Sequence, residues 1–252
     1  MSPLSTPPQT AIVTGAAQGL GLCIAQALHA AGYRVAITDR DADAAHAAAS
    51  ALDASGASAA GLGLDVTRKP DFEAALAFVQ QRWGGLQVAV NNAAVTLTTP
   101  VMEITPEEFD MVLRVNLRGT FLGCQVFGAA LAQAGYGRMI NVASLAGQNG
   151  GTASGAHYAS SKSGILTLTK IFARELASRG VTVNAVAPGP MDLPSVHAAV
   201  PPQRLARLVE AIPVRKLGNP RFVAGLVVQL ASPEADFATG AAWDINGGIF
   251  MR

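Results

Sequence analysis

Tyr158 and Lys162 are the residues of this sequence whose types and spacing best fit acid–base chemistry. Side chains four positions apart lie one turn apart on the same face of a helix. A tyrosine phenol has an ordinary pKa of about 10, and a fixed ammonium nearby favours the phenolate and lowers that pKa. The pair is therefore a candidate general base, and Ser144, fourteen residues before Tyr158, is a candidate hydrogen-bond donor to a substrate oxygen. The alternative is that the pair belongs to the surface of an amphipathic helix.

A glycine-rich segment near the start of the chain is a candidate phosphate-binding turn. The apolar run 11–13 leads into Thr14-Gly15-Ala16-Ala17-Gln18-Gly19-Leu20-Gly21, and an apolar helical pattern follows. A strand, a glycine-rich turn and a helix N-terminus together bind a pyrophosphate, because glycines let the backbone approach and the helix end presents free N–H groups. The GxxxGxG spacing differs from the usual GxGxxG, and a tight turn that binds nothing is the alternative.

Asp39 ends a second predicted strand, eighteen residues after Gly21. An acid at this place accepts hydrogen bonds from the adenosine ribose hydroxyls of a dinucleotide. It also repels a 2′-phosphate, so the sequence favours NAD over NADP. The alternative is that Asp39 caps the Ala-rich helix that follows, and one aspartate can fill both roles.

Strands and helices alternate along the chain, and several strands are near-continuous apolar runs, as expected for a parallel sheet covered on both faces. The predicted strands lie at 10–14, 33–38, 59–65, 87–91, 137–143, 181–187 and 241–245. The predicted helices lie at 19–31, 41–55, 69–84, 105–134, 157–179, 202–210 and 220–231. The sequence thus predicts a Rossmann-like, doubly wound α/β fold of about seven parallel strands, with 1–252 as a single domain. In such sheets ligands bind beyond the carboxyl ends of the strands. The candidate residues at those ends are Gly15, Asp39, Asp65, Asn91, Ser144 and Pro188.

Composition excludes several classes of function. The 252 residues are half hydrophobic and carry a net charge of +1, so no electrostatic footprint for nucleic acid or an anionic membrane is present. We expect a cytoplasmic protein with a flexible tail at 1–9, because no apolar run is long enough to span a bilayer and the start lacks signal-peptide character. Cys23 and Cys124 lie in apolar helical runs and are predicted to be small hydrophobic residues, not a disulfide or metal ligands.

Taken together, these motifs resemble the short-chain dehydrogenase/reductase family in its single-domain branch. The resemblance runs from about Thr10 to Gly248. The matching motifs, in order, are Thr14-Gly15 through Gly21, Asp65-Val66, Asn91-Asn92-Ala93-Ala94, Asn116, Ser144, Tyr158 with Lys162, Asn184, and Pro188-Gly189. The family usually has Gly where Ala94 stands.

The resemblance implies direct hydride transfer between a nicotinamide and a secondary alcohol or ketone. It implies that Tyr158 takes the alcohol proton and that Ser144 hydrogen-bonds the developing carbonyl oxygen. Lys162 would lower the Tyr158 pKa and hold the nicotinamide ribose, and Asn116 would complete a water relay to Lys162. The cofactor-binding residues that the resemblance implies are Gly15, Gln18, Gly19, Leu20, Gly21, Asp39, Asp65, Val66, Asn92, Ala93, Tyr158, Lys162, Pro188 and Gly189.

Some of these residues have further implied roles or structural alternatives. Asp65 resembles the acid that contacts the adenine amino group, and its alternative is a loop carboxylate that caps the helix near Asp71. Asn91 and Ala93 resemble the turn that lines the adenosine ribose. Asn184 resembles a structural asparagine near the active site.

Three positions depart from the family pattern. The interval between Ser144 and Tyr158 is one residue longer than the commonest spacing. Leu193 stands where the family often has a threonine that binds the nicotinamide carboxamide, and Ser195 or backbone groups are possible replacements. His157 is predicted either to contact substrate or to be an inert, exposed residue.

The segment 190–212 lies where the family places its substrate lid, and prolines bound its short predicted helix. It is mostly apolar, which favours an uncharged or weakly charged substrate. The first hypothesis is an NAD-dependent alcohol, polyol or sugar dehydrogenase. The second is an NADPH-dependent carbonyl reductase, such as a 3-oxoacyl-acyl-carrier-protein reductase. It would want a basic residue where Gln18 stands, although Arg40 keeps it open. The complete set of Ser144, Tyr158, Lys162 and Asn116 argues against a regulatory protein without turnover. The many polar groups at the strand ends argue against a purely structural protein.

The helices at 105–134 and 157–179 carry more apolar residues than one sheet face requires. These residues include Phe121, Val126, Phe127, Ile165, Leu168 and Phe172. The resemblance implies that the two helices form a dimer interface and that the C-terminal region forms a second one. We therefore predict a homotetramer. The alternative is that the sheet buries these faces completely.

Overall fold

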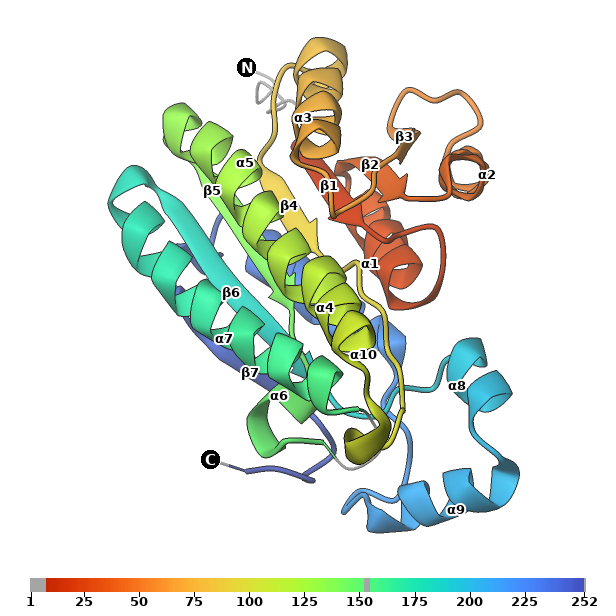
Figure 1. The fold of residues 1–252 in the computed structure, drawn as a ribbon. Helices are drawn as coiled ribbons and strands as arrows, with labels where there is room; N and C mark the ends of the chain where they lie inside the picture. The colour runs from red at the N-terminus through yellow and green to blue at the C-terminus, as the bar shows by residue number, and fades with distance from the viewer. Residues whose placement is uncertain (1–7, 152–154, 252) are drawn as a thin grey trace.

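The fold is a parallel sheet with helices on both faces, seen in a computed structural model that describes residues 8–151 and 155–251 (Figure 1). Within these residues, seven strands form one sheet in the order β3-β2-β1-β4-β5-β6-β7. The strands are β1 (Thr10–Thr14), β2 (Arg34–Asp39), β3 (Ala59–Gly63), β4 (Val88–Asn91), β5 (Gly137–Val142), β6 (Val181–Pro188) and β7 (Ala242–Ile245). Every neighbouring pair is parallel, so the predicted doubly wound α/β class is confirmed.

Two layers of helices enclose the sheet. One face carries α1 (Gly19–Ala30), α2 (Ala42–Leu52) and α10 (Pro220–Ala231). The other, nearer the viewer in Figure 1, carries α3 (Lys69–Trp83), α4 (Pro106–Leu113), α5 (Gly119–Ala134) and α7 (Ala156–Leu176). The short helices are α6 (Ala146–Asn149), α8 (Pro194–Ala199) and α9 (Pro202–Ala211). Helices α6 and α8 were not predicted, because one or two turns are too short to show a helical period. None of the helices in the described ranges combines the length and apolar composition that a bilayer crossing requires.

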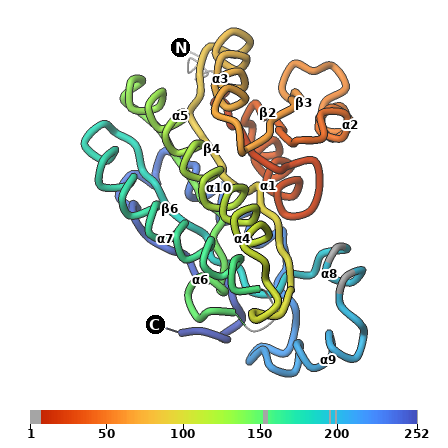
Figure 2. The backbone as a smooth tube through the Cα atoms, in the orientation of Figure 1, coloured from red at the N-terminus to blue at the C-terminus, as the bar shows by residue number. Residues whose placement is uncertain are grey.

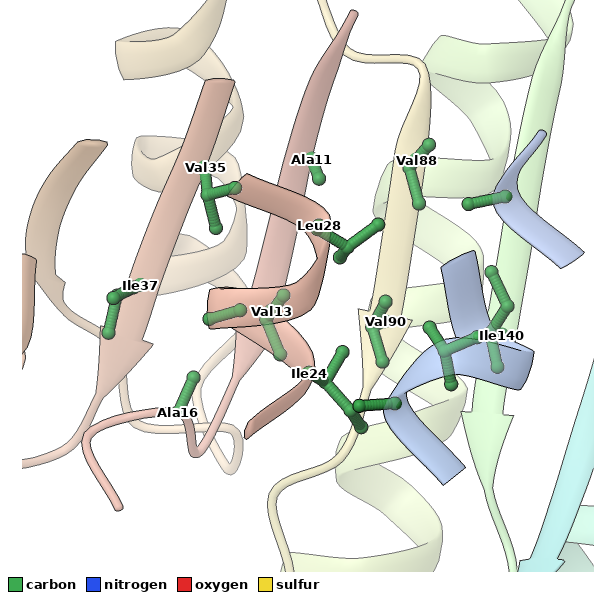
Figure 3. Packing of buried hydrophobic residues seen from close by; sticks show 14 of the residues in the cluster. Ala11, Val13, Ala16, Ile24, Leu28, Val35, Ile37, Val88, Val90 and Ile140 are labelled. Atoms are coloured by element: carbon green, nitrogen blue, oxygen red, sulfur yellow. The ribbon is translucent and has the colours of Figure 1, made fainter. Parts of the chain in front are cut away.

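Buried apolar side chains hold α1 against the sheet. Ile24 and Leu28, one helical turn apart, are completely buried over β1 and its neighbours (Figure 3). They pack with Val13 and Val90, whose strands lie side by side in the sheet. Burying each such side chain stabilises the fold by about 1.5–3 kcal/mol. The order of strands reverses between β1 and β4, which makes the carboxyl ends of these two strands the switch point where such sheets bind ligands.

The prediction of one continuous helix at 105–134 is wrong. The structure divides it into α4, a π-helical turn at Arg114–Arg118 and α5. Asn116 lies in that turn and is completely buried. Its side chain is held by the backbone of Val95, in the loop after β4, at 2.8 and 2.9 Å. A π-helical turn inside a longer helix is frequent at functional sites, and here it carries a predicted site residue.

Helices α8 and α9 stand apart from the sheet, beyond the carboxyl end of β6 (Figures 1 and 2). The chain segment that carries α8 and α9 begins and ends close to the same place, because Met191 before α8 forms a parallel bridge with Gly218 after α9. The N–H of Gly218 donates to the carbonyl of Pro190 at 2.9 Å, and the N–H of Asp192 donates to the carbonyl of Gly218 at 2.8 Å. The segment between these residues also contacts the C-terminal loop, where the N–H of Val214 donates to the carbonyl of Gly247 at 3.2 Å, and Ile212 just before it is buried.

Candidate active site

The turn after β1 is packed against the turn after β4. A Cβ added at Gly15, where φ is +61°, would lie 2.7 Å from the Cα of Ala93. The Thr14 hydroxyl accepts hydrogen bonds from the N–H groups of Asn92 at 3.0 Å and Ala93 at 3.2 Å. The Asn92 side-chain amide donates to the carbonyls of Thr14 and Gly15 at 3.0 and 2.9 Å. These bonds fix the glycine-rich turn at the switch point of the sheet.

The glycine-rich turn is closely packed at one glycine and open at another. A Cβ added at Gly21 would lie 2.3 Å from the carbonyl oxygen of Gly15, so only glycine lets α1 pack this closely. Gly19 has φ +60°, and a Cβ there would meet no atom within 4 Å. Gln18 precedes α1 with extended backbone and makes no side-chain hydrogen bond to the helix end. Leu20 is half-buried against the core. At Gly19 the start of α1 therefore faces open space, while Gly21 packs against the turn.

Asp39 lies beside this turn, at the carboxyl end of β2. Its carboxylate accepts hydrogen bonds from the N–H of Ala17 at 3.3 Å and from the N–H of Asp41 at 3.2 Å. The alternative that Asp39 caps the next helix is wrong, because Asp41 is the N-cap of α2 and accepts from the N–H of Ala44 at 3.0 Å. The charge of Asp39 is thus placed at the glycine-rich turn.

Asp65 and Val66 follow β3. The Asp65 carboxylate accepts the N–H of Thr67 at 2.8 Å and closes its own turn, while the carboxylate of Asp71 accepts the Asp65 N–H at 3.0 Å. The alternative that Asp65 caps the helix near Asp71 is therefore wrong. Val66 is buried, and a Cβ on Gly119 would lie 3.0 Å from its Cβ, so α5 packs closely on this loop.

Ser144, Tyr158 and Lys162 meet at the carboxyl end of β5. Tyr158 and Lys162 lie one turn apart on α7, and the Tyr158 side chain hydrogen-bonds to the hydroxyls of Ser144 and Thr96. Lys162 is 2% exposed, and its Nζ lies 5.6 Å from the centre of the Tyr158 ring. The same Nζ donates to the carbonyl oxygen of Val142 at 2.7 Å. The structure thus brings together the three residues that the sequence motif suggested.

The protonation of this pair differs from the sequence-based prediction. Burial raises the pKa of Tyr158, and the hydrogen bonds from Ser144 and Thr96 oppose this increase without cancelling it. Burial also lowers the pKa of Lys162 to about 8, because an ammonium loses solvation in the interior. The sequence predicted a lowered pKa for Tyr158, and that prediction is wrong, because loss of solvation is the largest influence on this pKa and raises it.

Asn116 connects the loop after β4 to α7. Besides its two bonds to Val95, its side-chain amide donates to the Ser161 hydroxyl at 3.1 Å. The Ser161 hydroxyl in turn donates to the carbonyl of Tyr158 at 2.7 Å. Both N–H groups of the Asn116 amide are thus used within the protein, and the side chain supports the turn of α7 that carries Tyr158.

The environment of His157 differs most from what the sequence predicts. The prediction of an inert, exposed residue is wrong, because the side chain is completely buried. Its Nε2 lies 2.7 Å from a carboxylate oxygen of Glu108, and its Nδ1 accepts the N–H of Tyr158 at 2.8 Å. Sequence analysis also missed Glu108 and Thr96. Thr105-Pro106-Glu107-Glu108 signals a helix start, but no local pattern shows that this helix faces the residue before Tyr158.

Pro188 and Gly189 end β6 next to Ser144. The carbonyl of Pro188 accepts the N–H of Leu145 at 2.9 Å, and Gly189 packs closely on Asn246, where an added Cβ would lie 3.0 Å from the Asn246 Cα. Leu193 is the N-cap residue of α8 and packs partly against the core. The side chain of Ser195 lies outside the described residues.

The other asparagines of the motifs have structural roles. The Asn91 side chain, implied to line the adenosine ribose, instead points into the core and donates to Asn141 at 2.9 Å. Asn184 donates to the carbonyl of Ala238 at 2.6 Å and accepts the N–H of Ala241 at 3.2 Å, in agreement with its structural assignment. Across the described ranges, no three His, Cys, Asp or Glu side chains gather closely enough to hold a metal ion.

Comparison with known proteins gives relatives that match almost the whole chain. The sequence model of a family described as enoyl-(acyl carrier protein) reductase matches residues 15–249. A 3-oxoacyl-(acyl-carrier-protein) reductase of Vibrio cholerae is 38% identical, over 96% of this chain and 98% of the relative. The enzyme of the same name from Escherichia coli is 36% identical, over 96% and 97%. A sorbitol dehydrogenase of Cereibacter sphaeroides is 34% identical, over 96% and 98%.

Proposed function

The chain belongs to the short-chain dehydrogenase/reductase family, and we propose that it uses NAD to interconvert a secondary alcohol and its ketone. Membership makes it an oxidoreductase that acts on CH–OH or carbonyl groups of a small molecule with a nicotinamide cofactor. The substrate class that we propose is a polyol, a sugar or a small hydroxy compound. The observation that carries this proposal is the Tyr158 phenol, which hydrogen-bonds to two hydroxyls beside a buried lysine.

When bound, the nicotinamide dinucleotide supplies the acceptor or donor of the hydride. The residues that we propose hold it are Gly15, Gln18, Gly19, Leu20, Gly21, Asp39, Asp65, Val66, Asn92, Ala93, Tyr158, Lys162, Pro188 and Gly189. The close packing at Gly15 and Gly21 and the open space at Gly19 support this assignment.

Tyr158 is the proton-transfer residue of the proposed mechanism. It accepts the proton of an alcohol during oxidation and returns it to a ketone oxygen during reduction. The hydroxyls of Ser144 and Thr96 lie within hydrogen-bond reach of the Tyr158 side chain, so a substrate oxygen that approaches Tyr158 also approaches these two groups, and Ser144 would turn its hydroxyl to donate to that oxygen. Lys162 places a positive charge behind the tyrosine ring, and Asn116 supports the same turn of α7. The water relay from Asn116 to Lys162 stays a prediction of the family resemblance, and it would need an oxygen of Asn116 because both side-chain N–H groups are bonded within the protein.

Asp39→Ala is expected to narrow the preference for NAD(H) over NADP(H). We expect that preference to be at least about tenfold in the unchanged protein, or about 1.4 kcal/mol, because the carboxylate would lie beside a 2′-phosphate. The measurement is kcat/KM with both cofactors. Asp41→Ala is the matched control, since Asp41 caps α2 and should change stability without changing the preference. Equal efficiency with both cofactors in the unchanged protein would contradict the assignment of NAD.

A second candidate is an NADPH-dependent carbonyl or 3-oxoacyl-acyl-carrier-protein reductase, and the names of the Vibrio cholerae and Escherichia coli relatives favour it. The sorbitol dehydrogenase relative, at a similar identity, favours the first candidate. A panel of secondary alcohols, sugars, ketones and 3-oxoacyl thioesters, tested with both nicotinamide cofactors, separates them. Highest kcat/KM on a 3-oxoacyl thioester with NADPH would select the second candidate, and no turnover of any compound would reject both.

We propose that residues 190–212 form a substrate lid on a catalytic domain that spans 1–252. The bridge between Met191 and Gly218, which joins the two ends of the segment that carries α8 and α9, and the position of these helices apart from the sheet support this role (Figure 2). On α9, Leu205 and Leu208 are half-buried while Arg204 and Arg207 are exposed. The segment therefore also carries two basic side chains, and only its inner face supports the preference for an uncharged substrate.

The helical face of α5 and α7 is the proposed assembly surface. Val126, Phe127 and Ile165, which the sequence analysis offered as interface residues, are instead buried within the chain. Phe121 remains 38% exposed and lies against Phe172, with ring centres 6.0 Å apart. Beside it, an open and largely apolar groove of about 580 Å³ runs between the helices. The groove is lined by Leu113, Arg114, Leu117, Arg118, Phe121, Gly164, Thr167 and Leu168.

We expect light scattering at micromolar concentration to give the mass of a homotetramer, because a paired copy would cover this apolar groove. Phe121→Glu should lower the mass by placing a charge in the interface formed by α5 and α7. Phe237→Glu changes a fully exposed phenylalanine of the C-terminal region and should lower the mass if that region forms the second interface. A monomeric mass of the unchanged protein would contradict the assembly proposal.

A further inference from the structure

His157 is a completely buried side chain with both ring nitrogens engaged. Nδ1 accepts the N–H of Tyr158 at 2.8 Å, so this nitrogen carries a lone pair and no proton. Nε2 then carries the ring proton and donates it to Glu108 at 2.7 Å. A ring that is buried and satisfied in this way has no free group to offer a substrate, so its effect on the site is exerted through Tyr158.

The hydrogen bond to Tyr158 replaces a helix cap. The first N–H groups of a helix have no partner within it, and Tyr158 lies in the first turn of α7. The N-cap of α7 is Gly155, which has no side chain to cap the helix. A Cβ there would lie 2.3 Å from Cε1 of His157, so glycine also makes the room that the ring occupies. His157 thus fixes the backbone of Tyr158 itself.

Glu108 fixes the other side of the imidazole. It lies in the first turn of α4, where its N–H donates to Thr105 at 3.2 Å, and its carboxylate also accepts a hydrogen bond from Thr99. Thr99 and Thr96 belong to the loop after β4. The same loop is joined to α7 where the N–H of Gly155 donates to the carbonyl of Leu97 at 2.8 Å. One network therefore holds α4, this loop and the start of α7 together.

We propose that Glu108 and His157 are positioning residues that hold the Tyr158 phenol within reach of Ser144 and Thr96. The inference rests on the proposed role of Tyr158 in proton transfer. A displacement of about 1 Å at a reacting group costs on the order of a hundredfold in rate. The backbone of Tyr158 is anchored by His157 at its N–H and by Ser161 at its carbonyl. If the bond to His157 is lost, the backbone N–H of Tyr158 is no longer fixed, and the Tyr158 ring can change its orientation.

Three substitutions of His157 separate the two hydrogen bonds. His157→Leu removes both and should lower kcat on the order of tenfold, with the cofactor Kd unchanged. His157→Asn keeps an oxygen near the position of Nδ1, accepts the Tyr158 N–H and should restore most of kcat. His157→Gln reaches toward Glu108 without a group at the Nδ1 position, so kcat should stay low. Rescue by Asn but not by Gln assigns the effect to the Tyr158 backbone.

Glu108→Ala is a second route to the same test if the His157 variants fold poorly, and it should lower kcat with little change in the substrate KM. Glu107→Gln, at an exposed neighbour on the same turn, is the control and should leave kcat unchanged. A long-range ¹H–¹⁵N spectrum of the histidine rings should show one ring protonated at Nε2 only, and that signal should disappear in His157→Leu.

The outcomes distinguish failure of this inference from failure of the proposed function. Variants of Glu108 and His157 that unfold at a lower temperature but keep the kcat of the unchanged protein would overturn the inference. In that case the two residues would contribute to stability alone. A ring protonated at Nδ1 in the spectrum would also overturn it. Absence of turnover by the unchanged protein on every alcohol and ketone would reject the proposed function, and the spectrum would still decide whether His157 accepts the Tyr158 N–H.

Discussion

Tyr158→Phe is expected to lower kcat at least about a hundredfold, the range that a positioned acid or base contributes to proton transfer. The substitution removes one oxygen and keeps the ring, which lies 5.6 Å from the Lys162 ammonium. Cofactor Kd should therefore remain close to that of the unchanged protein. The measurement is steady-state turnover with the best substrate of the panel, together with a fluorescence titration of the cofactor.

Tyr33→Phe is the matched control for this prediction. Its hydroxyl donates to the carbonyl of Ala231 at 3.0 Å. Tyr33 directly precedes β2, so it lies at the amino ends of the strands, whereas Tyr158 lies at their carboxyl ends. Turnover of this variant should match the unchanged protein. If Tyr158→Phe retains more than about a tenth of the rate, proton transfer by Tyr158 is wrong.

The raised pKa of Tyr158 has a consequence for the direction of the reaction. A phenol whose pKa lies above its ordinary value is protonated at neutral pH. In that form it is ready to donate a proton to a ketone, whereas oxidation of an alcohol needs the phenolate. The acid form that ketone reduction needs therefore predominates near neutrality, and the rate of alcohol oxidation is expected to rise as the pH approaches the pKa of Tyr158. The bonds from Ser144 and Thr96 limit how far that pKa is raised.

The strands and most of the site were predictable because their signals are local. The buried strands are short apolar runs, and β1 with the glycine-rich turn forms one continuous signature. Tyr158 and Lys162 are fixed relative to each other by one turn of helix. Asp39 was placed correctly at the end of β2, but its capping alternative failed because Asp41 is better placed to bind the first turn of α2.

The residues that were missed act across long separations in the chain. Glu108 and His157 are 49 positions apart, and their contact depends on how α4 packs against α7. A histidine next to Tyr158 gives no local sign of burial, because the helix that packs against it decides whether its side chain is exposed. Phe127 and Ile165 show the same limit, since an apolar helical residue fits the core of one chain as well as an interface between two copies.

Gly21→Ala is expected to lower the free energy of unfolding by about 3 kcal/mol, at the upper end for an overpacked site. The new Cβ would lie 2.3 Å from the Gly15 carbonyl oxygen and 2.5 Å from the Asn92 side-chain nitrogen. The Gly15 carbonyl is backbone, and the Asn92 nitrogen is held by the carbonyls of Thr14 and Gly15, so neither contact can be relieved by a flexible chain end. Relief requires α1 to move away from the turn, and the affinity for cofactor should fall with stability.

Gly225→Ala is the control that makes this result specific. Gly225 lies inside α10, is exposed, and a Cβ there would meet no atom within 4 Å. Because alanine is favoured over glycine in a helix by about 1 kcal/mol, this variant should be at least as stable as the unchanged protein. Urea unfolding and cofactor titration of both variants provide the measurement. A Gly21→Ala protein as stable as Gly225→Ala, with unchanged cofactor affinity, would mean that α1 does not depend on close contact with the glycine-rich turn. The open space at Gly19 would then not depend on the packing at Gly21, and the proposed phosphate site would need another structural support.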